Sequence, residues 1–266
     1  ALTTAGDNTL IGSYAGDAAT TAGPLIAIGN NAGGAITTGN GNCLVGQAAG
    51  DSLTTGGNNT AFGNYTLRGM TEGSAITAVG YNAGNVHTSG VANVYVGAYC
   101  GDANTTGGYN TFLGDAAGGA NTSGSYNTFV GKNAGYGGTT SAPYSSGNNN
   151  TALGYNTLAL FTTGFGNTAV GYAAGGAITT GNHNAIFGYI AGEDLTTGTY
   201  NSLMGVDAGK SITTSSYNVI MGFQTGDAIT TGEKNVAVGY QALGSNTTAS
   251  TNTAVGDSAL HACTTG

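Results

Sequence analysis

Charged residues are scarce in this chain: Asp, Glu, Lys and Arg together make up only 6% of its 266 residues. The four cations are Arg68, Lys132, Lys210 and Lys234, against twelve carboxylates, and the formal net charge is −8. A protein that neutralises a phosphate backbone needs clustered cations. The composition therefore excludes nucleic acid as a partner.

Tryptophan is absent, proline occurs twice, and no apolar run approaches the roughly 18 to 20 residues that a membrane-spanning helix requires. We therefore expect no membrane insertion. Glycine, in contrast, supplies 51 residues. A chain of this composition lacks the bulk for a thick globular core, but it suits thin coils packed backbone on backbone.

One glycine recurs every seventeen residues, with a single six-residue slip, and we use it as the anchor of a repeat. The fifteen anchors are Gly12, Gly29, Gly46, Gly63, Gly80, Gly97, Gly114, Gly131, Gly154, Gly171, Gly188, Gly205, Gly222, Gly239 and Gly256. A short fixed period is typical of solenoids, in which each unit buries its apolar face against its neighbours. The sequence predicts an all-β fold, a parallel β-solenoid or β-roll of about 15 coils, forming one domain over residues 1–266.

The residue one before each anchor is large and apolar in every unit, and the residue two before it is apolar as well. Side chains alternate faces along a strand, so both faces of this strand need cover. Sister chains in a homotrimer would cover the second face, and an intrachain sheet is the alternative. Candidate chain–chain interface residues two before the anchor are Tyr95, Phe112 and Phe129.

Polar residues also recur in register. Asparagine lies four before the anchor in thirteen units, and threonine lies eight after it in all fifteen, usually followed by a second threonine. Stacked amides and hydroxyls can pass hydrogen bonds from coil to coil. We predict a structural ladder that includes Asn110, Asn127, Asn167, Thr179 and Thr196. The glycine after the threonine pair is expected to supply a corner with positive φ, and an Ala-Gly pair a second corner.

Two runs carry a resemblance: Asn150–Leu158 reads N-T-A-L-G-Y-N-T-L and Asn252–Leu260 reads N-T-A-V-G-D-S-A-L. They resemble the N-T-A-L-G-Y-x-A-L…T-T-G repeats of phage tail fibres and bacterial surface fibres. More distantly, they are similar to the head repeats of trimeric autotransporter adhesins. The resemblance spans the chain and implies a left-handed parallel β-roll with three chains around one axis. The frequent Ala-Gly, where those fibres often have Ala-Leu, is a departure from their pattern.

No catalytic, metal or cofactor site is predicted. The three histidines and the three cysteines each fall at different phases of the repeat: His87, His183, His261, Cys43, Cys100 and Cys263. Coils rise by about 4.8 Å each, which leaves the cysteines too far apart for a disulfide. We expect small buried thiols and surface histidines. Acidic residues recur at one corner with gaps between coils, whereas a cation site needs several convergent oxygens.

Two features interrupt the repeat. The insertion Ser141, Ala142, Pro143, Tyr144, Ser145 and Ser146 is a candidate binding loop, because insertions in solenoids become loops on one face. Tyrosines cluster at two phases, five before the anchor and one after it. They would pack between chains or, alternatively, stack on sugar rings.

The function expected from these features is a non-enzymatic structural or adhesive fibre segment: an extracellular, cell-surface or virion rod that presents or forms a binding surface for a cell-surface glycan or protein receptor. The chain begins and ends within a repeat unit, and we expect a piece of a longer fibre or a stackable subunit. The second expectation is therefore an end-to-end filament subunit. Ice binding is a third expectation, disfavoured because adjacent threonines on an extended strand point in opposite directions.

Overall fold

The computed structural model describes residues 6–138 and 145–264. The chain divides into two compact units, Ala1–Asn127 and Thr128–Gly266, and each is described by itself. Within the described residues every regular element is a short strand. No helix there is long and apolar enough to cross a membrane.

Each repeat contributes one strand of three or four residues that ends immediately before the anchor glycine. In the first unit the strands are β1 (Thr9–Ile11), β2 (Leu25–Ile28), β3 (Asn42–Val45), β4 (Thr60–Phe62), β5 (Thr77–Val79), β6 (Val94–Val96) and β7 (Thr111–Leu113). In the second they are β8 (Thr128–Val130), β9 (Thr151–Leu153), β10 (Thr168–Val170), β11 (Ala185–Phe187), β12 (Ser202–Met204), β13 (Val219–Met221), β14 (Val236–Val238) and β15 (Thr253–Val255).

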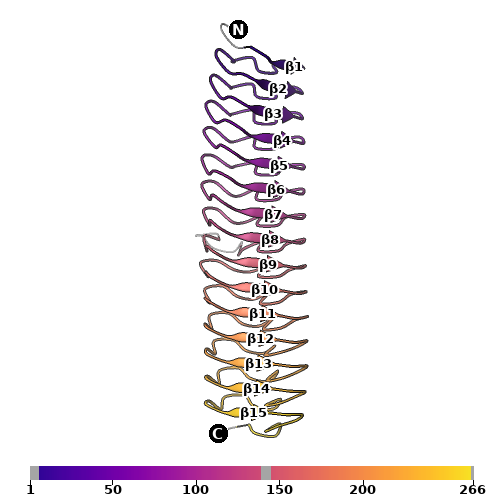
Figure 1. Cartoon of the computed structure of the whole chain (residues 1–266), viewed down its shortest axis with the longest axis vertical. Helices are drawn as coiled ribbons and strands as arrows, with labels where there is room; N and C mark the ends of the chain where they lie inside the picture. Colours follow the sequence, from indigo (N-terminus) through magenta and orange to yellow (C-terminus); the bar gives the residue numbers. More distant parts are fainter. Residues whose placement is uncertain (1–5, 139–144, 265–266) are drawn as a thin grey trace. The chain divides into compact units, whose positions relative to one another are not determined.

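Consecutive strands within each unit pair in parallel and in register, so that equivalent residues of successive repeats lie side by side (Figure 1). Ala185 of β11, for example, pairs with Ser202 of β12, and Phe187 with Met204. This confirms the predicted parallel β-solenoid with its 17-residue spacing. The left-handed coiling of the solenoid and its association into trimers remain predictions.

The strand has an inner and an outer face. The residue two before the anchor is buried inside its own coil, whereas the residue one before it points outward. Tyr95, Phe112 and Phe129 are therefore core residues with no exposed surface, and their predicted place in a chain–chain interface is wrong. Glycines four after the anchor make room for these rings: a Cβ on Gly118 would collide with Phe112, and one on Gly135 with Phe129.

Asparagine four before the anchor lies on the same inner side and forms a ladder, which Leu25 and Ile76 interrupt in the first unit and which is unbroken in the second. In the second unit the amide nitrogen of Asn184 donates to Oδ1 of Asn167 and to the carbonyl of Gly198. Asn201 repeats both bonds one coil further along. The predicted ladder residues Asn110, Asn127 and Asn167 each donate their backbone N–H to Oδ1 of the preceding asparagine. The ladder ties adjacent coils together at a buried corner.

One of the two corners differs from the expectation. The glycine that follows the threonine pair, such as Gly39 or Gly181, does not have positive φ; a Cβ there would meet the carbonyl of the equivalent glycine in the next coil. Positive φ occurs instead two residues further on, usually at a non-glycine residue such as Tyr200 (φ 58°), so the earlier glycine is there to permit close stacking. The Ala-Gly corner is as expected, with positive φ at Gly175 (φ 58°).

Candidate functional site

The outer face of the sheet carries a column of apolar side chains in each unit. Its residues lie one before the anchor, and many are half exposed in the single chain: Phe62 is 58% exposed, Leu153 47% and Met204 47%. Residues three before the anchor share this face and are mostly threonine. Over β11–β13 the small side chains of Ala185 and Ser202 leave a shallow apolar groove beside Phe187, Met204 and Met221. No described segment of the chain covers these side chains, so the intrachain alternative is not realised there.

Exposed aromatic side chains form ladders at two positions of the repeat, one residue after the anchor and five residues before it. Tyr155, Tyr172 and Tyr189 stack with ring centroids 5.5 and 5.1 Å apart. In the other column His183, Tyr200 and Tyr217 stack at 5.2 and 5.3 Å, with interplanar angles of 15° and 10°. Each inner ring is covered on both faces by its neighbours. A sugar that needs an open ring face could therefore not stack within these ladders, which favours a packing role for the tyrosines.

Both threonines of the pair that lies eight and nine residues after the anchor have solvent-exposed surface. The first, such as Thr179, is partly exposed and the second, such as Thr180, is exposed, while the flanking Ile178 and Gly181 are buried. Neither threonine belongs to a strand. The pair therefore does not lie on an extended strand, which was the premise of the argument against ice binding, because the backbone bends there. The predicted ladder residues Thr179 and Thr196 donate Oγ1 to the carbonyls of Thr196 and Thr213, at 3.3 and 3.0 Å.

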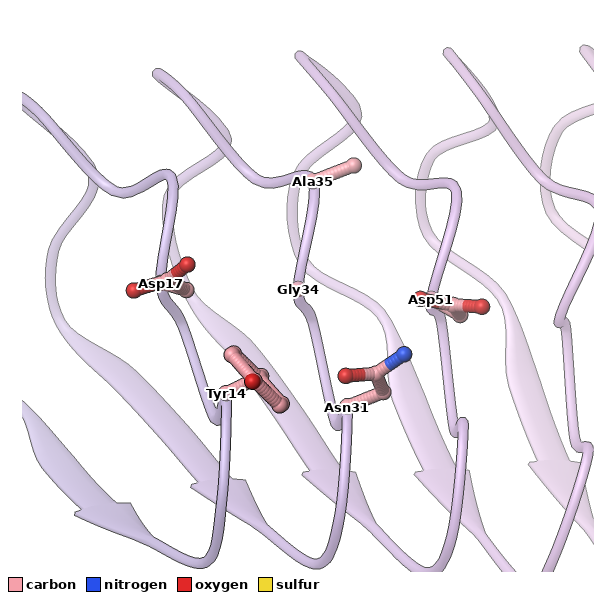
Figure 2. Close-up of a pocket in the computed structure, with 6 residues that line it drawn as sticks. All are labelled: Tyr14, Asp17, Asn31, Gly34, Ala35 and Asp51. Atoms are coloured by element: carbon pink, nitrogen blue, oxygen red, sulfur yellow. The ribbon is translucent and has the colours of Figure 1, made fainter.

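A polar hollow opens at another corner of the first unit, around Gly34 (Figure 2). Asp17, Gly34 and Asp51 occupy equivalent positions of three successive coils, so the missing side chain of Gly34 leaves a gap between two carboxylates. Tyr14 and Asn31 line its other side. Within the described residues no group of three or more His, Cys, Asp or Glu side chains is placed to hold a metal.

Sequence reasoning missed a buried polar column in the first unit. His87, Asn104 and Asn121 occupy the inner position seven after the anchor, which holds Ile36 and Leu53 in earlier coils, and all three are fully buried. His87 Nε2 lies 3.0 Å from the carbonyl of Gly90, and Nδ1 lies 3.5 Å from the Tyr95 hydroxyl. The amide nitrogens of Asn104 and Asn121 have no hydrogen-bond partner. The sequence could have predicted that His87 is buried, because His87 stands at the same position of the repeat as the core isoleucines.

Burial sets the protonation of this region. Desolvation lowers the pKa of His87, against the opposing effect of its bond to the Gly90 carbonyl. Burial raises the pKa of the Cys100 thiol to about 12, and that thiol donates to the carbonyl of Phe112. Desolvation also raises the pKa of Asp102 to about 6. His87 and Cys100 are therefore neutral at neutral pH and fully buried, whereas the Asp102 carboxylate is partly exposed.

The candidate binding loop falls mainly outside the described residues, which include only Ser145 and Ser146 of its six. Ser145 is buried and donates Oγ to the carbonyl of Phe161 at 2.8 Å. The N–H of Ser146 donates to the carbonyl of Thr162. These two residues rejoin the coil, and Ser141, Ala142, Pro143 and Tyr144 lie outside the described residues. The three cysteines are free thiols.

Comparison with protein families, with curated proteins and with solved structures found no match to this chain. The resemblance to fibre repeats therefore rests on the sequence motifs alone. The proposed function is therefore based on the exposed surfaces of the two units.

Proposed function

We propose that this chain is a non-enzymatic structural or adhesive fibre segment that assembles with copies of itself, as a homotrimer, through the outer face of its sheet. In this proposal the assembled rod lies outside the cell, on a cell surface or on a virion. It presents or forms a surface that binds a glycan or a protein receptor.

The exposed column one before the anchor is the observation that supports assembly. Large contiguous apolar patches are uncommon on soluble monomers and usually mark an interaction site. Here the column repeats at the strand spacing of about 4.8 Å, so copies of the chain offer each other matching surfaces. Symmetric association is the simplest way to bury a surface that recurs in every coil.

The experiment is to measure the mass in solution of the wild-type chain and of the variants Val170→Asp and Val238→Asp. Both valines are half buried on the outer face, in β10 and β14. A carboxylate is hydrated there in a single chain but would be buried without a partner in the assembly. We expect three times the 25.8 kDa of one chain for the wild type and the mass of one chain for each variant, with unchanged circular dichroism.

Thr180→Asp is the matched control, because Thr180 is exposed on a different face, and it should keep the mass of the assembly. A wild-type chain that sediments as a monomer would contradict the proposal. Masses without an upper limit, together with filaments in electron micrographs, would favour the filament subunit instead.

A further inference from the structure

Twelve threonines of the second unit form a regular array along its coils. The inner rank, eight residues after the anchor, consists of Thr162, Thr179, Thr196, Thr213, Thr230 and Thr247. The outer rank, one residue further on, consists of Thr163, Thr180, Thr197, Thr214, Thr231 and Thr248. No other residue type interrupts either rank in these six coils. In the first unit Glu72, Ser89 and Ser123 interrupt the outer rank.

The inner rank is held in one conformation by a repeated hydrogen bond. Each of its hydroxyls donates to the backbone carbonyl of the next threonine in the rank, at distances from 3.0 to 3.4 Å. Threonine has few side-chain rotamers, and the same bond at every coil selects the same one. The methyl and hydroxyl groups of the inner rank therefore repeat with the strand spacing of about 4.8 Å.

The outer rank is free to contact water. All six of its side chains are exposed. The structure gives their hydroxyls no protein hydrogen bond. A hydroxyl that is not engaged with protein both donates to and accepts from water. Together the ranks offer two parallel rows of identical methyl and hydroxyl groups on a backbone whose coils are hydrogen-bonded to each other.

Such a surface should bind ordered water more favourably than it binds liquid water. Immobilising waters from the liquid costs entropy, whereas the molecules of an ice surface are fixed before contact. A rigid and regular array can hydrogen-bond to that surface while its methyl groups lie against the lattice. The outer sheet face is less suitable, because its apolar column in the same unit varies between valine, leucine, phenylalanine and methionine.

We propose that the two threonine ranks of the second unit are an ice-binding surface, whose ligand is the ordered water of an ice crystal. This inference does not rest on the proposed fibre function, since the ranks and the apolar column are separate surfaces.

The test measures thermal hysteresis and ice-crystal shape in solutions of the full chain, with three proteins compared at equal concentration. The first is the wild type and the second is the double variant Thr197→Lys, Thr214→Lys, which places two long charged side chains in the middle of the outer rank. The third is Val206→Lys, which places one at an exposed position just after the anchor Gly205 in the same unit, outside the threonine ranks and outside the sheet. All three substituted residues are exposed, and circular dichroism would verify that the variants fold.

We expect the wild type and Val206→Lys to shape ice and to depress its growth temperature equally, and the double variant to lose both effects. A folded wild-type chain without hysteresis or ice shaping would overturn the proposal. So would a double variant that keeps the full effect, or an equal loss in Val206→Lys, which would show that the effect does not depend on the threonine ranks.

Discussion

His87 occupies a core position of the repeat, although the residues next to it in the sequence are surface residues. Its side chain replaces the isoleucine or leucine of other coils and is fully buried. Burial lowers its pKa below the usual 6.5. An unfolded chain therefore takes up a proton at a higher pH than the folded one does. The contribution of His87 to stability is complete above pH 6.5 and is lost as the pH falls below that value.

We predict that His87→Leu removes this acid sensitivity. The difference in melting temperature between wild type and variant, followed by circular dichroism, should shift in favour of the variant as the pH falls from 7.5 to 5. Comparing the two proteins cancels the opposite effect of Asp102, whose raised pKa applies to both. Ile178→Leu is the control, because it changes the same core position in another coil without a titratable group, and it should give a difference that is the same at both pH values.

Cys100 should be the unreactive thiol of the three. It is fully buried and its pKa is raised to about 12, and only the thiolate is nucleophilic. We predict that iodoacetamide at pH 8 labels Cys263, which is partly exposed, before it labels Cys100. Labelling of Cys43, which lies on the outer sheet face, depends on whether the assembly covers it. Peptide mass spectrometry gives the three rates. Equal rates in the folded protein would contradict the assigned burial, and denaturant should abolish the difference.

At the scale of the element, the asparagine ladder joins each coil to the next. Asn184 uses all of its side chain: Nδ2 donates to Asn167 and Gly198, and Oδ1 accepts two bonds from Asn201. A net hydrogen bond contributes about 1 kcal/mol, and unpaired buried partners add to the loss. We predict that Asn184→Ala lowers the free energy of unfolding by about 3 kcal/mol, measured by urea denaturation.

Asn182→Ala is the matched control for the ladder, two residues away. Asn182 lies partly exposed and accepts one bond, from the N–H of Phe165. We expect it to lower the free energy of unfolding by about 1 kcal/mol or less. Equal losses for the two variants would mean that the buried ladder adds nothing beyond a surface contact.

The spacing of residues was enough to predict the strands, their parallel register and the ladders. It did not decide which of two adjacent apolar columns faces inward, and Tyr95, Phe112 and Phe129 were placed on the wrong side. The decisive signal was the asparagine four before the anchor. Residues two apart in a strand share a face, so burying that ladder puts the residue two before the anchor inside. The threonine pair was misjudged because its backbone bends instead of extending.

At the scale of the whole molecule, stability in a solenoid is a sum of contacts between neighbouring coils. The coils of β6 and β7 carry Asn104 and Asn121, whose buried amide nitrogens lack partners. The coils of β11–β13 have Leu195, Ile212 and Ile229 at the same position. An unsatisfied buried donor costs about 1 to 3 kcal/mol. The first group of coils should therefore open more readily.

Hydrogen exchange measured by mass spectrometry at neutral pH tests this difference. Peptides that contain β6 and β7 should exchange about tenfold faster than those that contain β11–β13, since about 1.4 kcal/mol corresponds to a factor of ten. The double variant Asn104→Leu, Asn121→Leu should slow the first group. Faster exchange in β11–β13 would show that the polar column is not the weak point.

Repetition also limits what the sequence reveals about the whole. Every coil satisfies the same local rules, so a pattern of seventeen residues predicts the stack well. The insertion around Pro143 has no period to interpret it, and Ser141–Tyr144 lie outside the described residues. His87 does have the repeat phase of the core isoleucines, but its hydrogen-bond partners could come only from the three-dimensional arrangement.

The stacked tyrosines provide a spectroscopic signal for folding. Because the chain has no tryptophan, its near-ultraviolet signal comes from phenol rings, and Tyr172 lies between two of them at centroid distances of 5.5 and 5.1 Å. Chromophores this close share their excitation, so the native protein should show a coupled dichroic band that vanishes when the coils separate. The molecule therefore carries a built-in optical probe, and its unfolding can be followed without any attached label.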